Sequence, residues 1–122
     1  MPARSKPESI RSMFAAYRSK DRATVEALLT DDFTFTSQYD DAIGKAVYFE
    51  RCWPNSERIR THLLEKKIFE QGSEAFVLYK CITNDGDEFR DTEFFRFAGD
   101  QVRQIEVYFG ASYHNGAFVK AQ

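Results

Sequence analysis

The first half of the chain carries apolar residues at helical spacing. Asp21 is placed to cap the second of three predicted helices, and Pro54 is expected to stop the third at Trp53. The predicted first helix covers residues 7–19, with a proline suited to its first turn. The apolar faces comprise Ile10, Met13, Phe14 and Tyr17 in the first helix, Val25, Leu28 and Leu29 in the second, and Ala46, Phe49 and Trp53 in the third.

The rest of the chain alternates as strands do. The segment FTFTS (residues 33–37) is a short strand between the second and third helices. Four longer strands are predicted in RIRTHLLEKKIFE, EAFVLYKCIT, DEFRDTEFFRF and QVRQIEVYF, separated by the turn-forming segments QGS, NDGD and AGDQ. Helices followed by strands predict an α+β fold, with the helices packed on one face of a curved antiparallel sheet.

The turn NDGD predicts which side chains share a face of this sheet. If it closes a tight hairpin, Thr83 pairs with Glu88, and antiparallel partners lie on the same face. The resulting pairs are Ile82 with Phe89, Lys80 with Asp91, Leu78 with Glu93, and Phe76 with Phe95. We expect this set on the concave side, together with Arg103, Ile105, Val107 and Phe109 if AGDQ forms an odd-numbered loop with a bulge. A slip of one residue would reverse the assignment.

Composition and charge narrow the class of function. The chain has 122 residues, so a single domain spanning 1–122 is expected. Seventeen basic and nineteen acidic residues give a net charge of -2 without a basic stripe, so no nucleic-acid partner is expected. Aromatic residues make up 16% of the chain, including twelve Phe and six Tyr, which predicts either a dense core or a lined cavity.

The sequence offers no sign of a targeting segment or a metal site. The N-terminal MPARSKPES has no apolar run and the longest strictly apolar run is AFVLY, so neither a signal peptide nor a membrane span is expected and the cytoplasm is the expected location. Cys52 and Cys81 are expected to be reduced packing thiols. With no Gly-rich phosphate loop, nucleophile elbow or zinc spacing, we expect no metal and no cofactor.

The order of elements resembles a known family. DRATVEALLTDDFTF after the first helix and FFRFAGDQVRQIEVYFG over the last hairpin are similar to the nuclear-transport-factor-2-like superfamily, in its SnoaL-like and ketosteroid-isomerase-like branch. The likeness covers about residues 8–110. It implies a cone, in which a strongly curved mixed or antiparallel sheet wraps around three N-terminal helices and encloses an apolar cavity. It also implies homodimers through the convex sheet face, with residues 111–122 as a tail or interface arm.

The resemblance also suggests a buried acid. The isomerase branch uses an Asp base together with a Tyr and a protonated Asp that donate hydrogen bonds to an oxyanion. Alignment on the shared RF before the last turn puts Glu93 at the protonated acid, whereas the tyrosine position falls near Met13, one helical turn before Tyr17, and the base position at Ser37. Ketosteroid isomerisation itself is therefore not expected, while a different proton transfer or addition inside the same cavity stays open.

Two adjacent acids lie close to that base position. Asp40 and Asp41 are candidate bases if their loop swings over the cavity, with Glu93 as the acid and Tyr17 as a hydrogen-bond donor. In the plainer interpretation, Asp41 only caps or begins the helix after Gly44 and Asp40 is solvated. Glu93 could equally be bonded to Tyr17, Arg103 or a buried water, and Lys80 with Asp91 could be only a cross-strand ion pair.

Two hypotheses about function follow. The first is a cofactor-independent isomerase, cyclase or lyase-type (dehydratase) enzyme that performs acid-base chemistry on a small apolar or aromatic molecule. The second is a non-catalytic ligand-binding or dimerisation module of the same fold. The catalytic residues of the first are Glu93, Asp40, Asp41 and Tyr17. The expected ligand-binding residues are Tyr39, Phe49, Trp53, Phe76, Lys80, Asp91, Phe95, Ile105 and Phe109.

Overall fold

The computed structural model describes residues 5–119, except for the side chains of residues 63–67. Within this range the chain forms three α-helices, one 3-10 helix and a seven-stranded sheet, which confirms the α+β prediction. The helical segments are α1 (Lys6–Ser19), α2 (Arg22–Leu28), α3 (Lys45–Arg51) and η1 (Trp53–Arg58). The strands are β1 (Leu29–Thr36), β2 (Ile43–Gly44), β3 (Ile59–Gln71), β4 (Glu74–Thr83), β5 (Glu88–Ala98), β6 (Gln101–His114) and β7 (Ala117–Val119).

Helix α1 begins and ends with recognisable capping groups. The Ser5 hydroxyl accepts from the Glu8 amide as an N-cap and donates to the Glu8 carboxylate, and Lys20 ends the helix in the left-handed region at φ 60°. Its predicted apolar face is buried, with Ile10, Met13 and Phe14 between 0 and 4% exposed. None of the described helices is long and apolar enough to cross a membrane.

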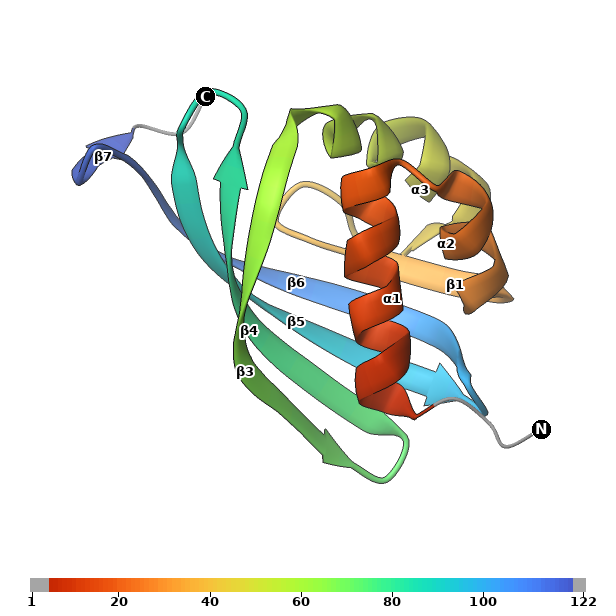
Figure 1. The fold of residues 1–122 in the computed structure, drawn as a ribbon. Helices are drawn as coiled ribbons and strands as arrows, with labels where there is room; N and C mark the ends of the chain where they lie inside the picture. The colour runs from red at the N-terminus through yellow and green to blue at the C-terminus, as the bar shows by residue number, and fades with distance from the viewer. Residues whose placement is uncertain (1–4, 120–122) are drawn as a thin grey trace.

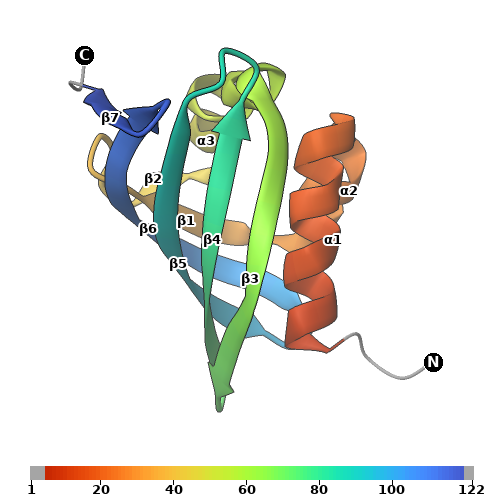
Figure 2. The ribbon, with the colours of Figure 1, turned by 60° about the vertical axis from the view of Figure 1, so that its left-hand side comes forward.

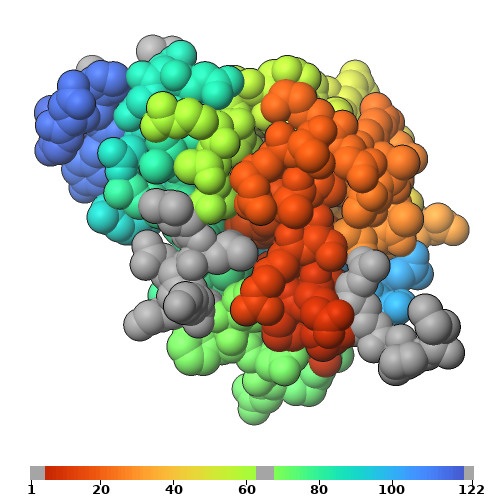
Figure 3. Space-filling view, in the orientation of Figure 1, coloured from red at the N-terminus to blue at the C-terminus, as the bar shows by residue number. Residues whose placement is uncertain are grey.

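The sheet is mixed and strongly curved, as the cone prediction requires. Its order is β2-β1-β6-β5-β4-β3 with β7 added beside β6, and β1 and β6 are the parallel neighbours. The helices lie against one face of the sheet, which bends toward them (Figures 1 and 2). In the space-filling view, α1 runs down the middle of this side of the molecule (Figure 3). The core between helices and sheet includes Ile10, Phe33, Phe95 and Ile105, all nearly inaccessible.

Irregular pairing helps to produce the curvature. The register shifts along β3 and β4 between Leu64 and Lys67, and along β5 and β6 at two places. One of these shifts leaves Arg103 as an extra residue between Val102 and Gln104, which is the bulge expected near AGDQ. The expected odd-numbered loop is wrong, because Ala98 pairs with Gln101 around a two-residue loop. Arg103 is consequently exposed and pairs with Asp32, so its expected concave position is wrong.

The register of β4 against β5 differs by one residue from the prediction. Ile82 pairs with Glu88, and the loop between the strands is three residues long, because the Thr83 amide donates to the Asp87 carbonyl at 3.0 Å. Gly86 adopts φ 88°, the left-handed conformation that ends a three-residue hairpin loop. The shorter loop turns the β4 side chains over: the concave residues are Ala75, Val77, Tyr79 and Cys81, and the predicted Phe76, Leu78, Lys80 and Ile82 lie on the convex face.

Two other segments end at positions other than those predicted: α3 stops before Trp53, and the last long strand continues past Phe109. Helix α3 ends at Arg51, and Pro54 lies in the first turn of η1, where its missing amide costs nothing. The strand predicted to end at Phe109 continues as β6 to His114, and the chain then turns back as β7, which pairs with β6. The role of the C-terminal segment as an interface arm stays a prediction.

Candidate functional site

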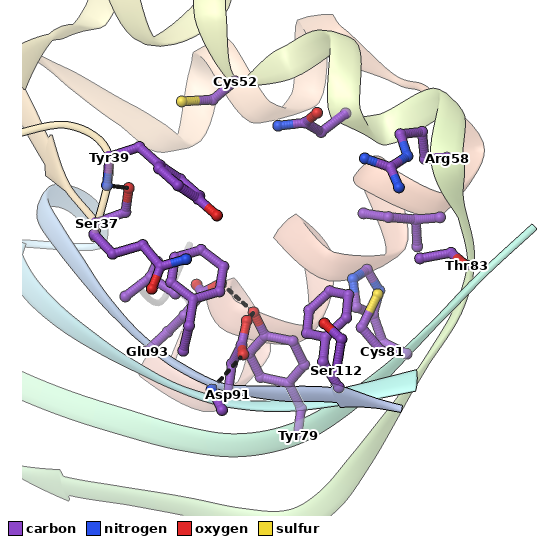
Figure 4. A pocket seen from close by; sticks show the side chains of 18 of the residues that line it. Ser37, Tyr39, Cys52, Arg58, Tyr79, Cys81, Thr83, Asp91, Glu93 and Ser112 are labelled. Atoms are coloured by element: carbon purple, nitrogen blue, oxygen red, sulfur yellow. Dashed lines mark hydrogen bonds between the residues drawn. The ribbon is translucent and has the colours of Figure 1, made fainter. Parts of the chain in front are cut away.

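A cavity of about 950 Å³ lies between the helices and the concave face of the sheet. Its walls come from α1, β1, the loop before β2, α3, η1 and strands β3 to β7. Figure 4 shows Tyr79, Asp91 and Glu93 grouped on the sheet side, opposite Cys52 and Arg58. A volume of this size accommodates a small organic ligand.

Two carboxyl groups and one hydroxyl form the polar centre of the cavity. Asp91 and Glu93 lie two residues apart on β5 and therefore on the same face, and Tyr79 reaches them from β4. The Tyr79 hydroxyl lies 2.7 Å from Glu93 Oε1 and 3.1 Å from Asp91 Oδ2. A hydroxyl has one proton to donate, so Tyr79 cannot donate a full hydrogen bond to both carboxylates at once. A proton bound to one of the two carboxyl groups supplies a second donor.

Burial makes these carboxyl groups weak acids. Loss of hydration raises the pKa of Glu93 to about 7, the Tyr79 hydrogen bond partly offsets this, and the charge of Asp91 adds to the rise. Burial likewise raises the pKa of Asp91 to about 6, against the lowering effects of the Gly110 amide and the Tyr79 hydroxyl. Tyr79 stays neutral, because burial and the two carboxylates raise its pKa well above 10. Between about pH 6 and 7 the pair therefore carries about one proton.

Gly110 on β6 supports the position of Asp91. Its amide lies 3.3 Å from Asp91 Oδ1 and donates to it. This contact occurs where β5 and β6 shift register between Phe89 and Asp91, and a Cβ atom on Gly110 would collide with the Arg90 carbonyl. Only glycine fits this close approach without displacement of the backbone.

Tyr17 lies near the carboxyl pair but is bonded elsewhere. Its hydroxyl contacts the Tyr48 hydroxyl, and its ring packs 4.9 Å from Trp53. Burial raises the pKa of Tyr17 well above 10, with further contributions from the charges of Glu93 and Cys52. Glu93 is thus held by Tyr79, and the plainer alternatives of a bond to Tyr17 or Arg103 are wrong. The role of Tyr17 as a donor to a ligand stays a prediction.

The adjacent aspartates have different environments. Asp40 lines the cavity with its side chain only 6% exposed, so the interpretation of Asp40 as solvated is wrong. Arg51 Nη1 lies 2.8 Å from Asp40 Oδ1, so the two side chains form an ion pair. Their alignment is too poor for a hydrogen bond, and Oδ1 accordingly has no hydrogen-bond donor among the described residues. Asp41 is exposed and absent from the cavity wall, and the N-cap of α3 is Gly44, so Asp41 does not cap that helix.

The predicted ligand-binding residues divide into three groups. Four of them line the cavity: Tyr39, Asp91, Ile105 and Phe109. Three belong to the core or border it, namely Phe49, Trp53 and Phe95. Two lie on the convex face, Phe76 and Lys80, for the reason of register given above. Lys80 pairs with Glu88 instead of Asp91, so the predicted ion pair is wrong.

Three residues of the site do not stand out in the sequence. The predicted register puts Tyr79 on the convex face, and the correct loop length turns it inward toward the carboxyl pair. Gly110 lies inside an irregular pairing that alternation does not reveal. His62 also lines the cavity, and a lone histidine on a long strand carries no distinctive pattern.

Comparison with known proteins agrees with the geometry of the fold. An NTF2-like protein of unknown function from Cytophaga hutchinsonii superposes with a TM-score of 0.70 at 17% identity, covering 89% of this chain and 94% of that one. A candidate polyketide cyclase from Pseudomonas putida gives 0.71 at 16% identity, covering 88% and 92%. A protein with a ketosteroid isomerase-like fold from Catenulispora acidiphila, in complex with trimethylamine, gives 0.68 at 13% identity, covering 87% and 88%.

These identities are low, so the solved structures show the fold alone. No curated protein matches the chain significantly. The model of the SnoaL-like domain, however, matches residues 10–105, which is most of the sequence. The chain therefore belongs to the SnoaL-like domain family.

Proposed function

We propose that the protein is a cofactor-independent acid-base enzyme that acts on a small, largely apolar carbonyl compound. The observation that carries the proposal is the pairing of Asp91 and Glu93 through Tyr79 at a large cavity. Perturbed carboxyl groups that share a proton inside a cleft are typical of general acid-base sites. The candidate polyketide cyclase among the structural neighbours is consistent with this class of substrate.

The proposed chemistry is a keto-enol proton transfer. Ionised Asp91 removes a proton from the carbon next to the carbonyl, and the electrons of that C–H bond form the new C=C bond. The carbonyl oxygen takes the proton of Glu93 and becomes the enol hydroxyl. Return of a proton from Asp91 to carbon, with recovery of the Glu93 proton from the enol, gives isomerisation or exchange. Asp40 is not assigned this role, because its carboxylate is paired with Arg51.

The surroundings of the pair favour this chemistry. Phe14 and Tyr48 contribute apolar surface to the cavity, and Tyr39 and Phe109 pack 6.0 Å apart on its wall. A poorly hydrated site strengthens hydrogen bonds to the charge that develops on the carbonyl oxygen. Protonated Glu93 supplies such a bond without introducing a net charge.

Solvent deuterium exchange tests the proposal directly. The protein is incubated in D₂O with 1-tetralone, 2-tetralone and 2-indanone, and loss of the proton signals next to each carbonyl is followed by NMR. We expect exchange faster than in buffer, with a loss of about 10²-fold or more in Glu93→Gln and Asp91→Asn. Thr92→Val, between the two acids but on the convex face, is the matched control.

Exchange at equal rates in the wild type and in Glu93→Gln would contradict the proposal. If the ketones nevertheless bind, with protection against thermal unfolding, the second hypothesis of a non-catalytic ligand-binding module would take its place.

We also propose that the protein forms homodimers through the convex face of the sheet. Three apolar side chains there are notably exposed, Phe76 at 41%, Leu78 at 38% and Tyr108 at 60%. A surface of this kind favours association. Phe76→Glu should yield a monomer by light scattering after size exclusion, whereas Val47→Glu, an exposed apolar position on α3, should not change the mass. A wild-type monomer would rule this interface out.

A further inference from the structure

His62 is the one histidine on the cavity wall among the described residues, and the chemistry proposed above does not use it. It lies on β3 opposite Cys81 of β4. Its ring packs 4.8 Å from the ring of Phe14 on α1 and 5.7 Å from that of Tyr79. These contacts fix the plane of the imidazole beside the residue that holds the carboxyl pair.

A neighbouring cation determines where His62 carries its proton. Arg18 Nη1 lies 3.3 Å from His62 Nδ1. A guanidinium has donors and no acceptor, so Nδ1 must accept and cannot carry a proton. The neutral ring then has its proton on Nε2, and burial together with the Arg18 charge lowers the pKa of His62 to about 4.

The proton on Nε2 has no acceptor among the described residues. The hydrogen bonds of His62 there are limited to the one with Arg18. His62 lines the cavity wall, so within the part of the chain that the structure describes this donor is available to a ligand.

We propose that His62 is a second hydrogen-bond donor of the cavity, held by Arg18 in the tautomer with its proton on Nε2. It would select ligands that carry a second acceptor oxygen in addition to the carbonyl that meets Glu93. The inference takes the ligand site from the proposed function and specifies its substrate class as a carbonyl compound with a second oxygen. It requires binding and not turnover, and Arg18 acts as a positioning residue.

The tautomer is measured by long-range ¹H–¹⁵N correlation of the histidine rings in ¹⁵N-labelled protein. His114→Asn removes the signal of the second histidine. We expect His62 to carry its proton on Nε2 and to remain neutral between pH 5 and 8. Arg18→Met should raise the pKa of His62 toward its ordinary value and mix the two tautomers, whereas Arg11→Met, an exposed position on the same helix, should change neither. A proton on Nδ1, or an unchanged tautomer in Arg18→Met, would overturn the inference.

Ligand selection is measured with 1-tetralone and 6-methoxy-1-tetralone, which has an additional acceptor on the far side of its ring. In the wild type we expect the methoxy compound to bind about 2- to 10-fold more tightly, the range of one neutral hydrogen bond. His62→Gln keeps an N–H donor and should keep the preference, whereas His62→Phe should lose it. A preference that persists in His62→Phe would sink the inference. Equal deuterium exchange in the wild type and Glu93→Gln would sink only the proposed catalysis.

Discussion

The Tyr79 hydroxyl lies 2.7 Å from Glu93 Oε1, and this one bond joins β4 to the more weakly acidic of the two cavity carboxyl groups. A donor favours the ionised form of the carboxylate that accepts from it. The Tyr79 hydrogen bond therefore opposes the effect of burial and keeps the pKa of Glu93 close to neutral pH.

Removal of that donor should make Glu93 an even weaker acid. In Tyr79→Phe the hydrogen bond that lowers the pKa of Glu93 is lost while the ring remains, so this pKa should rise above about 7. The measurement is a ¹³C NMR titration of the glutamate carboxyl signals. Tyr39→Phe, which removes an exposed hydroxyl of the loop before β2, is the matched control, and an unchanged Glu93 titration in Tyr79→Phe would exclude the bond.

Glu93 should reduce stability at alkaline pH. Its folded-state pKa of about 7 lies above the ordinary 4.5, so its favourable contribution is complete below about pH 4.5 and is lost as the pH rises through 7. Glu93→Gln should accordingly increase the free energy of unfolding at pH 8 by about 2–3 kcal/mol relative to its effect at pH 4.5. Urea denaturation at both pH values measures this. A difference of zero would mean that Glu93 is hydrated.

The proposed exchange reaction should have a narrow pH optimum. Asp91 must be ionised, which fails below its pKa of about 6, and Glu93 must be protonated, which fails above its pKa of about 7. The rate plotted against pH should form a bell with its maximum between these values, with the two limbs belonging to the coupled pair. A rate that keeps rising to pH 9 would assign the chemistry to hydroxide or to another base.

Gly110 should tolerate no side chain. Gly110→Ala places a Cβ against the Arg90 carbonyl and displaces the amide that donates to Asp91. We expect a loss of about 1–3 kcal/mol in the free energy of unfolding, the range for overpacked sites. Gly44→Ala is the control, because nothing lies within 4 Å of the place its new Cβ would take and its φ is -78°. Equal stability of the two variants would disprove the steric argument.

The elements of this fold could be predicted from sequence because their signals are local. Helix α1 follows from its apolar spacing, and the segment EAFVLYKCIT coincides with β4 from its first residue to its last. The resemblance to the isomerase branch singles out Glu93, and the structure places this residue on the cavity wall. A pattern with a period of 2 or 3.6 residues is visible without knowledge of what lies across from it.

The cavity required information that local patterns do not contain. Whether Tyr79 or Lys80 faces inward depends on one residue of loop length, and both loop lengths fit NDGD. The pairing of Asp40 with Arg51 depends on the path of the irregular loop before β2. Hydrogen bonds donated by the amides of Ser37 and Ala42 hold this loop in its turn. Pairing across strands and loops is a non-local property, and only the tertiary structure determines it.

The three-residue loop between β4 and β5 has a consequence for how related chains can diverge. The length of this loop determines which alternate side chains of β4 face the cavity. Insertion or deletion of a single residue would therefore put Lys80 in place of Tyr79 beside Asp91 and Glu93. A neutral hydrogen-bond donor would be replaced by a cation, and the two weakly acidic carboxyl groups would become ion-pair partners of the lysine. Related chains whose loop is one residue longer or shorter would therefore keep the same cone but carry ion-paired carboxylates in its cavity in place of weak acids.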